Sequence, residues 1–302
     1  ICKRCKALTT TVPHLHNTIR DYIALTKPRI ISLLLVTAVG GIFLAAQSVP
    51  DPILVFYVLL GGSLAAGGAH AINHYLDRDI DGRMGRTSHR PVVSGRITPR
   101  RALMFGIILN LLAFILLSTF INLLSACITL SGTLIYVFIY TMGLKRSTPQ
   151  NIVIGGAAGA GPPMVGWTAV TGSLDLPAIY LFAIVFFWTP PHFWALALMI
   201  KDDYAAARIP MLPVVTGVYE TKKAILLYSI LLTALTLMFF TIQAVGWIFF
   251  TSAAILGTGF IIYSWRLWRL PDIIGAKGTY LYSLAYLALL FISLIADSLI
   301  QI

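Results

Sequence analysis

The positions of the positive charges limit what this chain can fold into more than any other feature. The sequence contains nine apolar segments, each close to the roughly 20 residues that a helix needs to cross a bilayer. All 22 Lys and Arg residues fall in the N-terminal stretch or in every second connection between these segments. Cationic connections stay on the inner side of a membrane. The pattern therefore predicts an all-α membrane protein with its N-terminus inside and its C-terminus outside.

The predicted spans form one helical bundle and a single intramembrane domain over residues 1–302, because no linker or low-complexity stretch divides the chain. Hydrophobic residues make up 58% of the chain and charged residues 11%, which excludes an ordinary soluble domain. The nine expected spans are Ile30–Ala46, Ile53–Ile72, Ala102–Ile121, Leu123–Met142, Ile152–Val170, Ala178–Ile200, Ala224–Ala244, Trp247–Trp265 and Tyr280–Ile300.

The net charge of +11 does not indicate nucleic-acid binding, because the charge is spread over loops beside the membrane, where topology and anionic membrane lipid explain it. The surplus leaves room for a polyanionic substrate. The stretch before the first span is short, which favours a bacterial plasma membrane over a mitochondrial inner membrane. Cys2 and Cys5 form a lone C-x-x-C that is either a redox or metal half-site or, as we favour, part of a plain tail.

Three polar residues after the second span carry the strongest chemical signal. Asn73, Asp77 and Asp81 are spaced i, i+4, i+8 and share one helix face, whereas Asp79 points roughly the other way. The two stacked carboxylates repel each other, and Mg²⁺ is commonly held by one or two carboxylates together with substrate phosphates. The sequence thus predicts a magnesium site. The alternative is a solvated, charged helix end.

The same connection continues with Arg83, Arg86 and Arg90. The planar guanidinium group fits phosphate oxygens in a bidentate manner. Acidic residues for a metal and arginines for phosphate, within one loop, together indicate a diphosphate site. Alternatively, these arginines only set the topology.

A second long inner connection, four spans later, opens with Lys201, Asp202 and Asp203 and continues to Arg208. Because the two acids are adjacent, a regular helix would not direct both at one ligand. We expect one of them to bind metal and the other to pair with Lys201. The alternative for the second acid is a plain solvated helix end. The likeness of the two connections indicates a weak internal duplication, which would place a site between the halves.

Two further stretches lie within spans. Pro190 and Pro191 are expected to break or kink the sixth span, and His192 beside them to ligate a metalloporphyrin or act as a base. The alternative for His192 is a histidine that is hydrogen-bonded inside the bundle. The glycines between Gly155 and Gly161 favour close helix packing over a phosphate loop.

Taken together, these residues resemble the UbiA superfamily of intramembrane prenyltransferases, from Leu25-Thr-Lys-Pro-Arg29 to near the C-terminus. Asn73-x-x-x-Asp77-x-x-x-Asp81 matches the first acidic motif of that superfamily. Several other stretches are similar to those of its haem-modifying members. They are Asp77–Asp81, Arg86–Pro91, Leu144–Asn151, Trp188–Trp194, Lys201–Tyr204 and Ile209–Pro213.

The resemblance implies farnesyl diphosphate as donor, haem b as acceptor, Mg²⁺ as cofactor, and transfer of the farnesyl group to a haem vinyl group with release of diphosphate. It implies metal binding by Asn73, Asp77, Asp81 and Asp203, with Lys201 also catalytic. The residues then assigned to substrate binding are Arg83, Arg86, Arg90, Lys145, Arg146, His192 and Arg208.

The chain departs from the superfamily at its second motif, Asp-x-x-x-Asp. Met199 replaces the first acid if Asp203 is the second, and Leu198 replaces it if Asp202 is. This departure argues against a second metal, and Lys201 is expected to supply the charge that a second cation supplies elsewhere.

Two other functions stay open at this point. One is prenyl transfer to a quinone precursor or a chlorophyll-type acceptor, and the other is transport of an organic anion through broken helices. The sequence also leaves open whether a protein of the haem pathway or of oxidase assembly binds the chain.

Overall fold

The computed structural model describes residues 15–300, so the predictions for Cys2 and Cys5 lie outside the described residues. Within that range every regular element is helical, as expected. The elements are α1 (Leu15–Thr26), α2 (Pro28–Ala46), α3 (Pro52–Leu76), α4 (Arg78–Asp81), α5 (Pro99–Phe120), α6 (Leu123–Leu134), the π-helix η1 (Ile135–Leu144), α7 (Asn151–Gly159), α8 (Gly161–Thr171), α9 (Leu176–Met199), α10 (Lys201–Ala206), α11 (Leu212–Val215), α12 (Gly217–Met238), the 3₁₀-helix η2 (Phe239–Ile242), α13 (Trp247–Arg269) and α14 (Ala276–Ile300).

Proline residues and capping side chains set where the long helices begin. Helices α2, α3 and α5 each have proline in the first turn, where its missing N–H costs nothing. The Asp51 side chain accepts a hydrogen bond from the Ile53 N–H at 2.9 Å and caps α3. Asn122 caps α6 in the same way, through the Ser125 N–H at 2.8 Å, so a tight turn joins the third and fourth spans.

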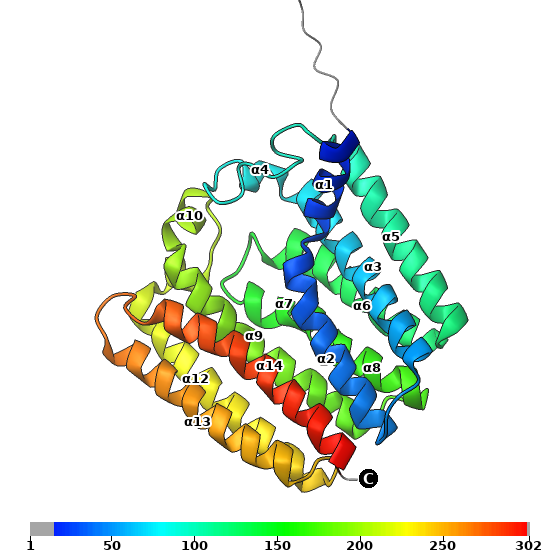
Figure 1. Ribbon diagram of the computed structural model, residues 1–302. Helices are drawn as coiled ribbons and strands as arrows, with labels where there is room; N and C mark the ends of the chain where they lie inside the picture. Colours follow the sequence, from blue (N-terminus) through cyan, green and yellow to red (C-terminus); the bar gives the residue numbers. More distant parts are fainter. Residues whose placement is uncertain (1–14, 301–302) are drawn as a thin grey trace, which may run out of the picture.

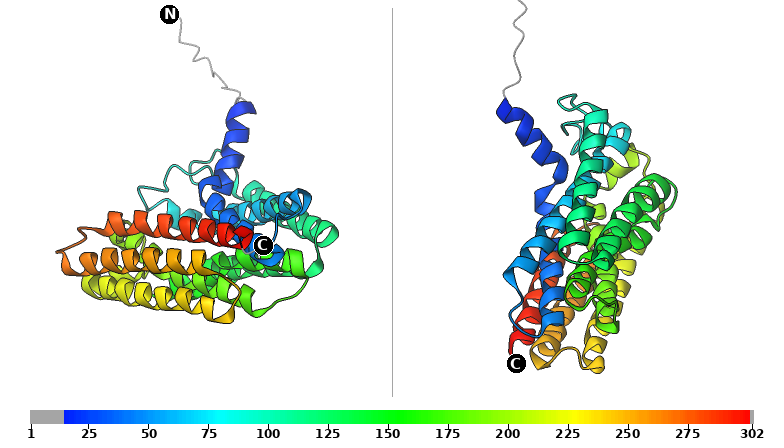
Figure 2. Two further views of the ribbon diagram at one scale, coloured as in Figure 1. Left: turned by 60° about the horizontal axis from the view of Figure 1, so that its bottom comes forward. Right: turned by 90° about the vertical axis from the view of Figure 1, so that its right-hand side faces the viewer.

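The long helices form a closed circuit. Following the contacts, α2 packs on α3, α3 on α5, α5 on α6, α6 on α7 and α8, α7 on α9, α9 on α12, α12 on α13, α13 on α14, and α14 returns to α2 (Figure 1). Helix α1 and the C-terminal end of α14 lie at opposite ends of the bundle (Figure 2). That arrangement agrees with an odd number of crossings.

Eight helices among the described residues are long and apolar enough to cross a membrane. The ninth expected span, Ile152–Val170, is divided into α7 and α8 at Ala160. The division has a local cause, because Pro162 and Pro163 cannot donate the N–H bonds that would continue α7. The expected number of nine is therefore approximate.

The prediction of close helix packing for the glycine-rich stretch holds for part of it. A Cβ atom built on Gly155 would lie 2.3 Å from Tyr140 Cδ2, whereas one built on Gly159 or Gly161 would meet nothing within 4 Å among the described residues.

The closest approach of two backbones lies just outside this stretch. A Cβ atom built on Gly166 of α8 would lie 2.1 Å from the Ala38 carbonyl oxygen of α2. One built on Gly41 of α2 would lie 2.2 Å from the Pro163 carbonyl oxygen. Only hydrogen fits at these two positions, so the backbones of α2 and α8 are in direct contact.

The sixth span differs from the expectation. Helix α9 runs without interruption through Pro190 and Pro191, so the predicted break is wrong. It is also the most buried of the eight candidate spans, with α7, α12 and α14 packed against it. Tertiary packing thus holds a helix that the two missing N–H groups would weaken in isolation.

At the opposite end of the bundle from α1, a buried acid ties two helices together. The Asp297 carboxylate of α14 accepts hydrogen bonds from the N–H groups of Gly246, Ile248 and Phe249, at 2.5, 3.2 and 3.3 Å. These are amide groups at the start of α13. A carboxylate at this position also interacts favourably with the positive end of the helix dipole.

We expect Asp297→Ala to lower the free energy of unfolding by about 1–3 kcal/mol, because it leaves buried N–H groups without an acceptor. Thermal unfolding in detergent would measure the loss. Ser298→Ala is the matched control, since Ser298 donates only to Leu294 of its own helix. Equal melting temperatures for the two variants would contradict the prediction.

Candidate active site

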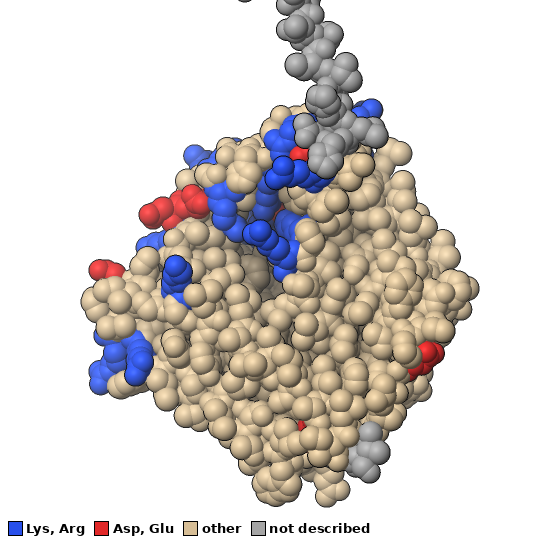
Figure 3. All heavy atoms as spheres, viewed as in Figure 1, with Lys and Arg blue, Asp and Glu red and all other residues tan. Residues whose placement is uncertain are grey.

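The candidate site lies at the end of the bundle where the cationic connections gather. Lys and Arg side chains cluster there around a hollow in the surface, and most of the rest of the visible face carries no charge (Figure 3). The connection after α3 and the segment around α10 both reach this end (Figure 1).

The acidic motif is buried. Asn73, Asp77 and Asp81 have exposed fractions of 3%, 0% and 3%, so the alternative of a solvated helix end is wrong. Helix α3 ends at Leu76, and Asp77 leads directly into the short α4. The Asn73 amide donates to the Asp77 carboxylate at 2.7 Å, so these two residues share a face as predicted.

Each buried carboxylate has a cation from elsewhere in the chain. The Lys145 ammonium group bonds to Asp77 Oδ2, and the Arg90 guanidinium group donates to Asp81 Oδ2 at 2.6 Å. Arg146 is a more distant partner, 3.8 Å from Asp77 Oδ1. Since an unpaired charge at such depth would be costly, these pairs offset the cost of burying the two acids.

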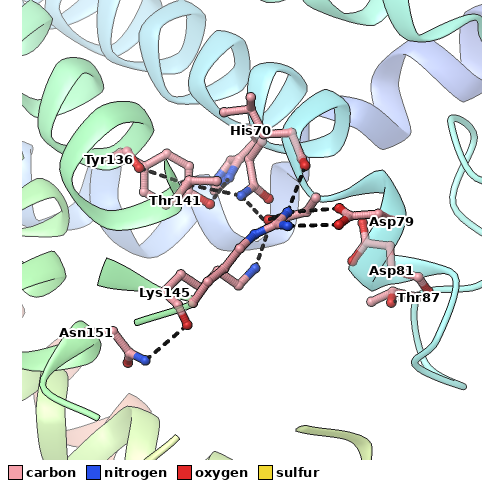
Figure 4. A network of polar contacts seen from close by, with 12 residues as sticks. His70, Asp79, Asp81, Thr87, Tyr136, Thr141, Lys145 and Asn151 are labelled. Atoms are coloured by element: carbon pink, nitrogen blue, oxygen red, sulfur yellow. Dashed lines mark hydrogen bonds and ion pairs between the residues drawn. The ribbon is translucent and has the colours of Figure 1, made fainter. Parts of the chain in front are cut away.

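Asp79 points away from this cluster, as expected. It is largely exposed, and its two carboxylate oxygens accept hydrogen bonds from the two terminal nitrogens of Arg146, each at 2.8 Å (Figure 4). That hydrogen-bonded fork holds the pKa of Asp79 below its usual value and raises that of Arg146. Arg146 therefore links α4 to the residues that follow η1.

Lys27 belongs to the cluster, although its charge had been assigned only to topology and its motif only to the family resemblance. It adopts the left-handed conformation, with φ of 52°, between α1 and α2, and its ammonium group lies 3.5 Å from Asn73 Oδ1. Burial, followed by the nearby charges of Arg90 and Lys145, lowers the pKa of Lys27 to about 7. Nothing local in the sequence reveals this contact, because 46 residues separate Lys27 from Asn73.

The π-helix η1 supplies side chains that the sequence did not indicate. Thr141 accepts a hydrogen bond from the Asn73 amide at 3.3 Å, and the Tyr136 hydroxyl lies 3.5 Å from His70 Nδ1 (Figure 4). Single turns of π-helix occur often at functional sites, because the wider turn changes the direction of side chains. An apolar segment such as Ile135–Leu144 carries no sequence signal for this conformation.

The two long inner connections meet, and the internal duplication stays a prediction. Ile80 and Met84 of the first pack in one apolar cluster with Tyr204 and Ile209 of the second. The Asp203 carboxylate also faces the first connection, since a Cβ atom built on Gly85 would lie 4.0 Å from its Oδ1.

Other predicted residues lie at the rim of the site. Within residues 15–300 Lys201 pairs with neither neighbouring acid, so that expectation is wrong. Arg83, Arg86 and Arg208 are exposed, and Arg208 has a left-handed φ of 56°. Burial raises the pKa of Tyr204, and the charges of Arg86 and Arg90 oppose that rise, which places both arginines near the second connection.

His192 lies in a different environment. Its ring is stacked on Trp188 of α9 and Tyr280 of α14, with ring centroids 4.3 and 4.9 Å away. Its Nδ1 lies 2.7 Å from the Ser283 hydroxyl. These are the contacts of a histidine bonded within the bundle. Binding of substrate by His192 stays a prediction.

The acidic cluster keeps one carboxylate oxygen that a cation could bind. Asp77 Oδ1 is buried and has no hydrogen-bond partner in the part of the chain that the structure describes. Oxygen ligands from one or two carboxylates and an amide suit Mg²⁺ when phosphate oxygens supply the remainder. Across residues 15–300 no three His, Cys, Asp or Glu side chains group as a metal site by themselves, so a metal here would need the substrate to complete its shell.

Known proteins with this fold and sequence pattern are numerous. The chain is 52% identical to a protein of Chloroflexus aurantiacus named protoheme IX farnesyltransferase, over 95% of this chain and 49% of that protein. A relative of the same name from Nostoc sp. is 52% identical, over 93% and 89%. The chain thus spans about half the length of the first relative and most of the second.

Solved structures agree on the fold. A structure titled for digeranylgeranylglyceryl phosphate synthase superposes with a TM-score of 0.78 at 18% identity, covering 95% of this chain and 100% of that one. A UbiA homolog from Archaeoglobus fulgidus, bound to DMAPP and Mg²⁺, gives 0.63 at 18% identity, over 91% and 99%. The sequence pattern of the UbiA prenyltransferase family itself matches residues 34–295. With that match covering most of the helical circuit and the acidic motif, the chain belongs to the UbiA prenyltransferase family.

Proposed function

We propose that this chain transfers the farnesyl group of farnesyl diphosphate to a vinyl group of haem b and releases diphosphate. The observation that carries the proposal is a buried pair of carboxylates, one with an unpartnered oxygen, enclosed by Lys27, Arg90 and Lys145 at the end of an apolar bundle. The names of the Chloroflexus and Nostoc relatives support farnesyl and haem as the two substrates.

Asn73, Asp77 and Asp81 would hold Mg²⁺, with Asp203 as a further ligand across the two connections; the metal supplies positive charge against the leaving diphosphate. The Archaeoglobus homolog with DMAPP and Mg²⁺ supports this choice of ion. The remaining charge comes from the protein. Lys145 and Arg90 are paired with the acids in this structure, and each has further N–H groups that can donate to phosphate oxygens. The Lys27 ammonium group lies beside Asn73 in the same cluster.

Loss of diphosphate leaves an allylic cation whose chain extends into the apolar bundle, where water is scarce. The π electrons of the haem vinyl group form the new carbon–carbon bond with that cation. The positive charge moves to the vinyl carbon next to the porphyrin ring, and a water oxygen bonds there and loses a proton. The sum is farnesyl diphosphate, haem and water giving hydroxyethylfarnesyl haem, diphosphate and a proton.

The positive charges also indicate how the bundle is oriented in the membrane. The cationic end, with α1 and the site, faces the cytoplasm of a bacterial cell, and the opposite end of the bundle faces out. Farnesyl diphosphate would then reach the acids from the inner side, with its apolar chain in the membrane. The contact of a partner from oxidase assembly would be at the inner connections, which present the polar surface.

The deciding experiment supplies purified protein with farnesyl diphosphate, Mg²⁺ and haem and identifies products by mass. We expect a haem heavier by one farnesyl group and one hydroxyl group, formed only with all three present. A quinone precursor that is prenylated while haem is not would favour the quinone alternative. Uptake of an organic anion into proteoliposomes, without any prenylated product, would favour a transporter.

We expect Arg86→Ala and Arg90→Ala to raise the Michaelis constant for farnesyl diphosphate more than that for haem. Loss of one hydrogen bond to a charged group costs about 1.5–3 kcal/mol. Arg100→Ala is the control, because Arg100 is an exposed arginine in the first turn of α5. If the constant for farnesyl diphosphate is unchanged in both variants, these arginines do not bind the diphosphate.

A further inference from the structure

Helix α3 carries two buried histidines that the reaction described above does not use. His70 and His74 have exposed fractions of 8% and 2%, and they precede and follow Asn73 on the same helix. Their positions relative to Asp77 are i−7 and i−3, so all four side chains lie on one face of α3. The histidines are thus the part of the acidic face that lies deeper in the bundle.

Three of the four ring nitrogens of these histidines lack a hydrogen-bond partner in the described part of the chain. They are His70 Nε2 and both nitrogens of His74. A buried polar atom without a partner costs about 1–3 kcal/mol, and native proteins rarely keep such atoms unless something binds there. Their grouping beside the acidic site indicates that a ligand contacts this face.

The two histidines differ in how firmly they are held. His70 meets Tyr136 of η1 edge-on, with ring centroids 5.6 Å apart and an interplanar angle of 87°, and its Nδ1 lies 3.5 Å from the Tyr136 hydroxyl (Figure 4). Histidines that ligate metals almost always have the second ring nitrogen held by such a partner, which fixes the ring and the tautomer. His74 has no such partner on either nitrogen.

We infer that His70 Nε2 is an axial ligand of the iron of the haem acceptor and so positions the porphyrin for transfer; the inference rests on the proposed function. Coordination needs the tautomer in which Nδ1–H donates to the Tyr136 oxygen, which leaves the Nε2 lone pair free. Neutral imidazole is the ordinary protein ligand of haem iron.

The placement along α3 agrees with the chemistry. At a rise of 1.5 Å per residue, His70 lies about 10 Å deeper than Asp77. A diphosphate held at Asp77 directs its allylic carbon along the same face toward His70. A porphyrin bound through its iron at His70 would bring its edge, which carries the vinyl groups, toward that carbon.

The test compares binding of haem with binding of metal-free protoporphyrin IX to the purified protein, because only the first can use an iron ligand. We expect wild type to prefer haem and His70→Ala to lose haem affinity by about tenfold or more, since even an outer partner of a metal-ligating histidine is worth about 10- to 100-fold. Affinity for protoporphyrin IX should be unchanged. Absorption and electron paramagnetic resonance spectra should lose the histidine-ligated signature and regain it when imidazole is added.

Controls separate this inference from its rivals. His89→Ala removes an exposed histidine and should leave the spectra unchanged. If His74→Ala or His192→Ala removes the preference for iron and His70→Ala does not, the inference is overturned. Equal affinity of wild type for the two porphyrins would overturn it as well. A different measurement tests the proposed function. That function fails if wild type binds farnesyl diphosphate normally but forms no farnesylated haem.

Discussion

Asp77→Asn and Asp81→Asn are each expected to reduce farnesyl transfer by about 10²–10³-fold or more, while membrane insertion stays normal. Removing one preorganised group that stabilises developing charge has effects of this size in other enzymes. Both changes keep the shape of the side chain and remove its charge. Asp77 should be the more sensitive of the two, because its Oδ1 is buried and, among the described residues, accepts no hydrogen bond and has only Arg146 nearby, at 3.8 Å.

Asp79→Asn is the matched control, since it makes the same chemical change two residues from each target. Asp79 is exposed and bonded to Arg146 outside the acidic face. We expect activity within a few-fold of wild type for this variant. Product formation would be measured at saturating Mg²⁺, with extraction in detergent and a single size-exclusion peak as the check on folding. Near wild-type rates for both Asp77→Asn and Asp81→Asn would refute the metal role.

The second large effect concerns stability. Gly166→Ala and Gly41→Ala each place a methyl group against a carbonyl oxygen of the facing helix, at 2.1 and 2.2 Å before any adjustment. A side chain could relieve such a contact by changing its rotamer, but a backbone carbonyl oxygen cannot. Helices α2 and α8 must therefore separate. Overpacking of this kind costs about 1–3 kcal/mol and sometimes more. We expect a lower melting temperature for both variants.

Gly159→Ala is the control for this experiment. A Cβ atom built on Gly159 meets nothing within 4 Å among the described residues, and alanine is the better helix former. We expect this variant to melt at the same temperature as wild type or slightly higher. Similar destabilisation by all three substitutions would mean that the close approach of α2 and α8 does not limit stability.

Sequence reasoning located the spans well, because a helix in a bilayer satisfies its own backbone and so needs only length and apolarity. It also placed Asn73 and Asp77 on one face, since helical periodicity is local. It failed where neighbours decide. The prolines of α9 do not break that helix, because surrounding helices hold it, whereas Pro162 and Pro163 divide the fifth expected span at Ala160.

The pairing of charges shows the same division between local and non-local information. The sequence identified which residues carry charge and predicted that they share one side of the membrane. It could not assign Lys145 to Asp77, because 68 residues separate them, or Lys27 to Asn73. Topology and the acidic face were fixed by the order of residues along the chain. The partners of the acids, and the unsatisfied histidines beside them, were decided by the closure of the helical circuit, which brings distant helix ends to one place.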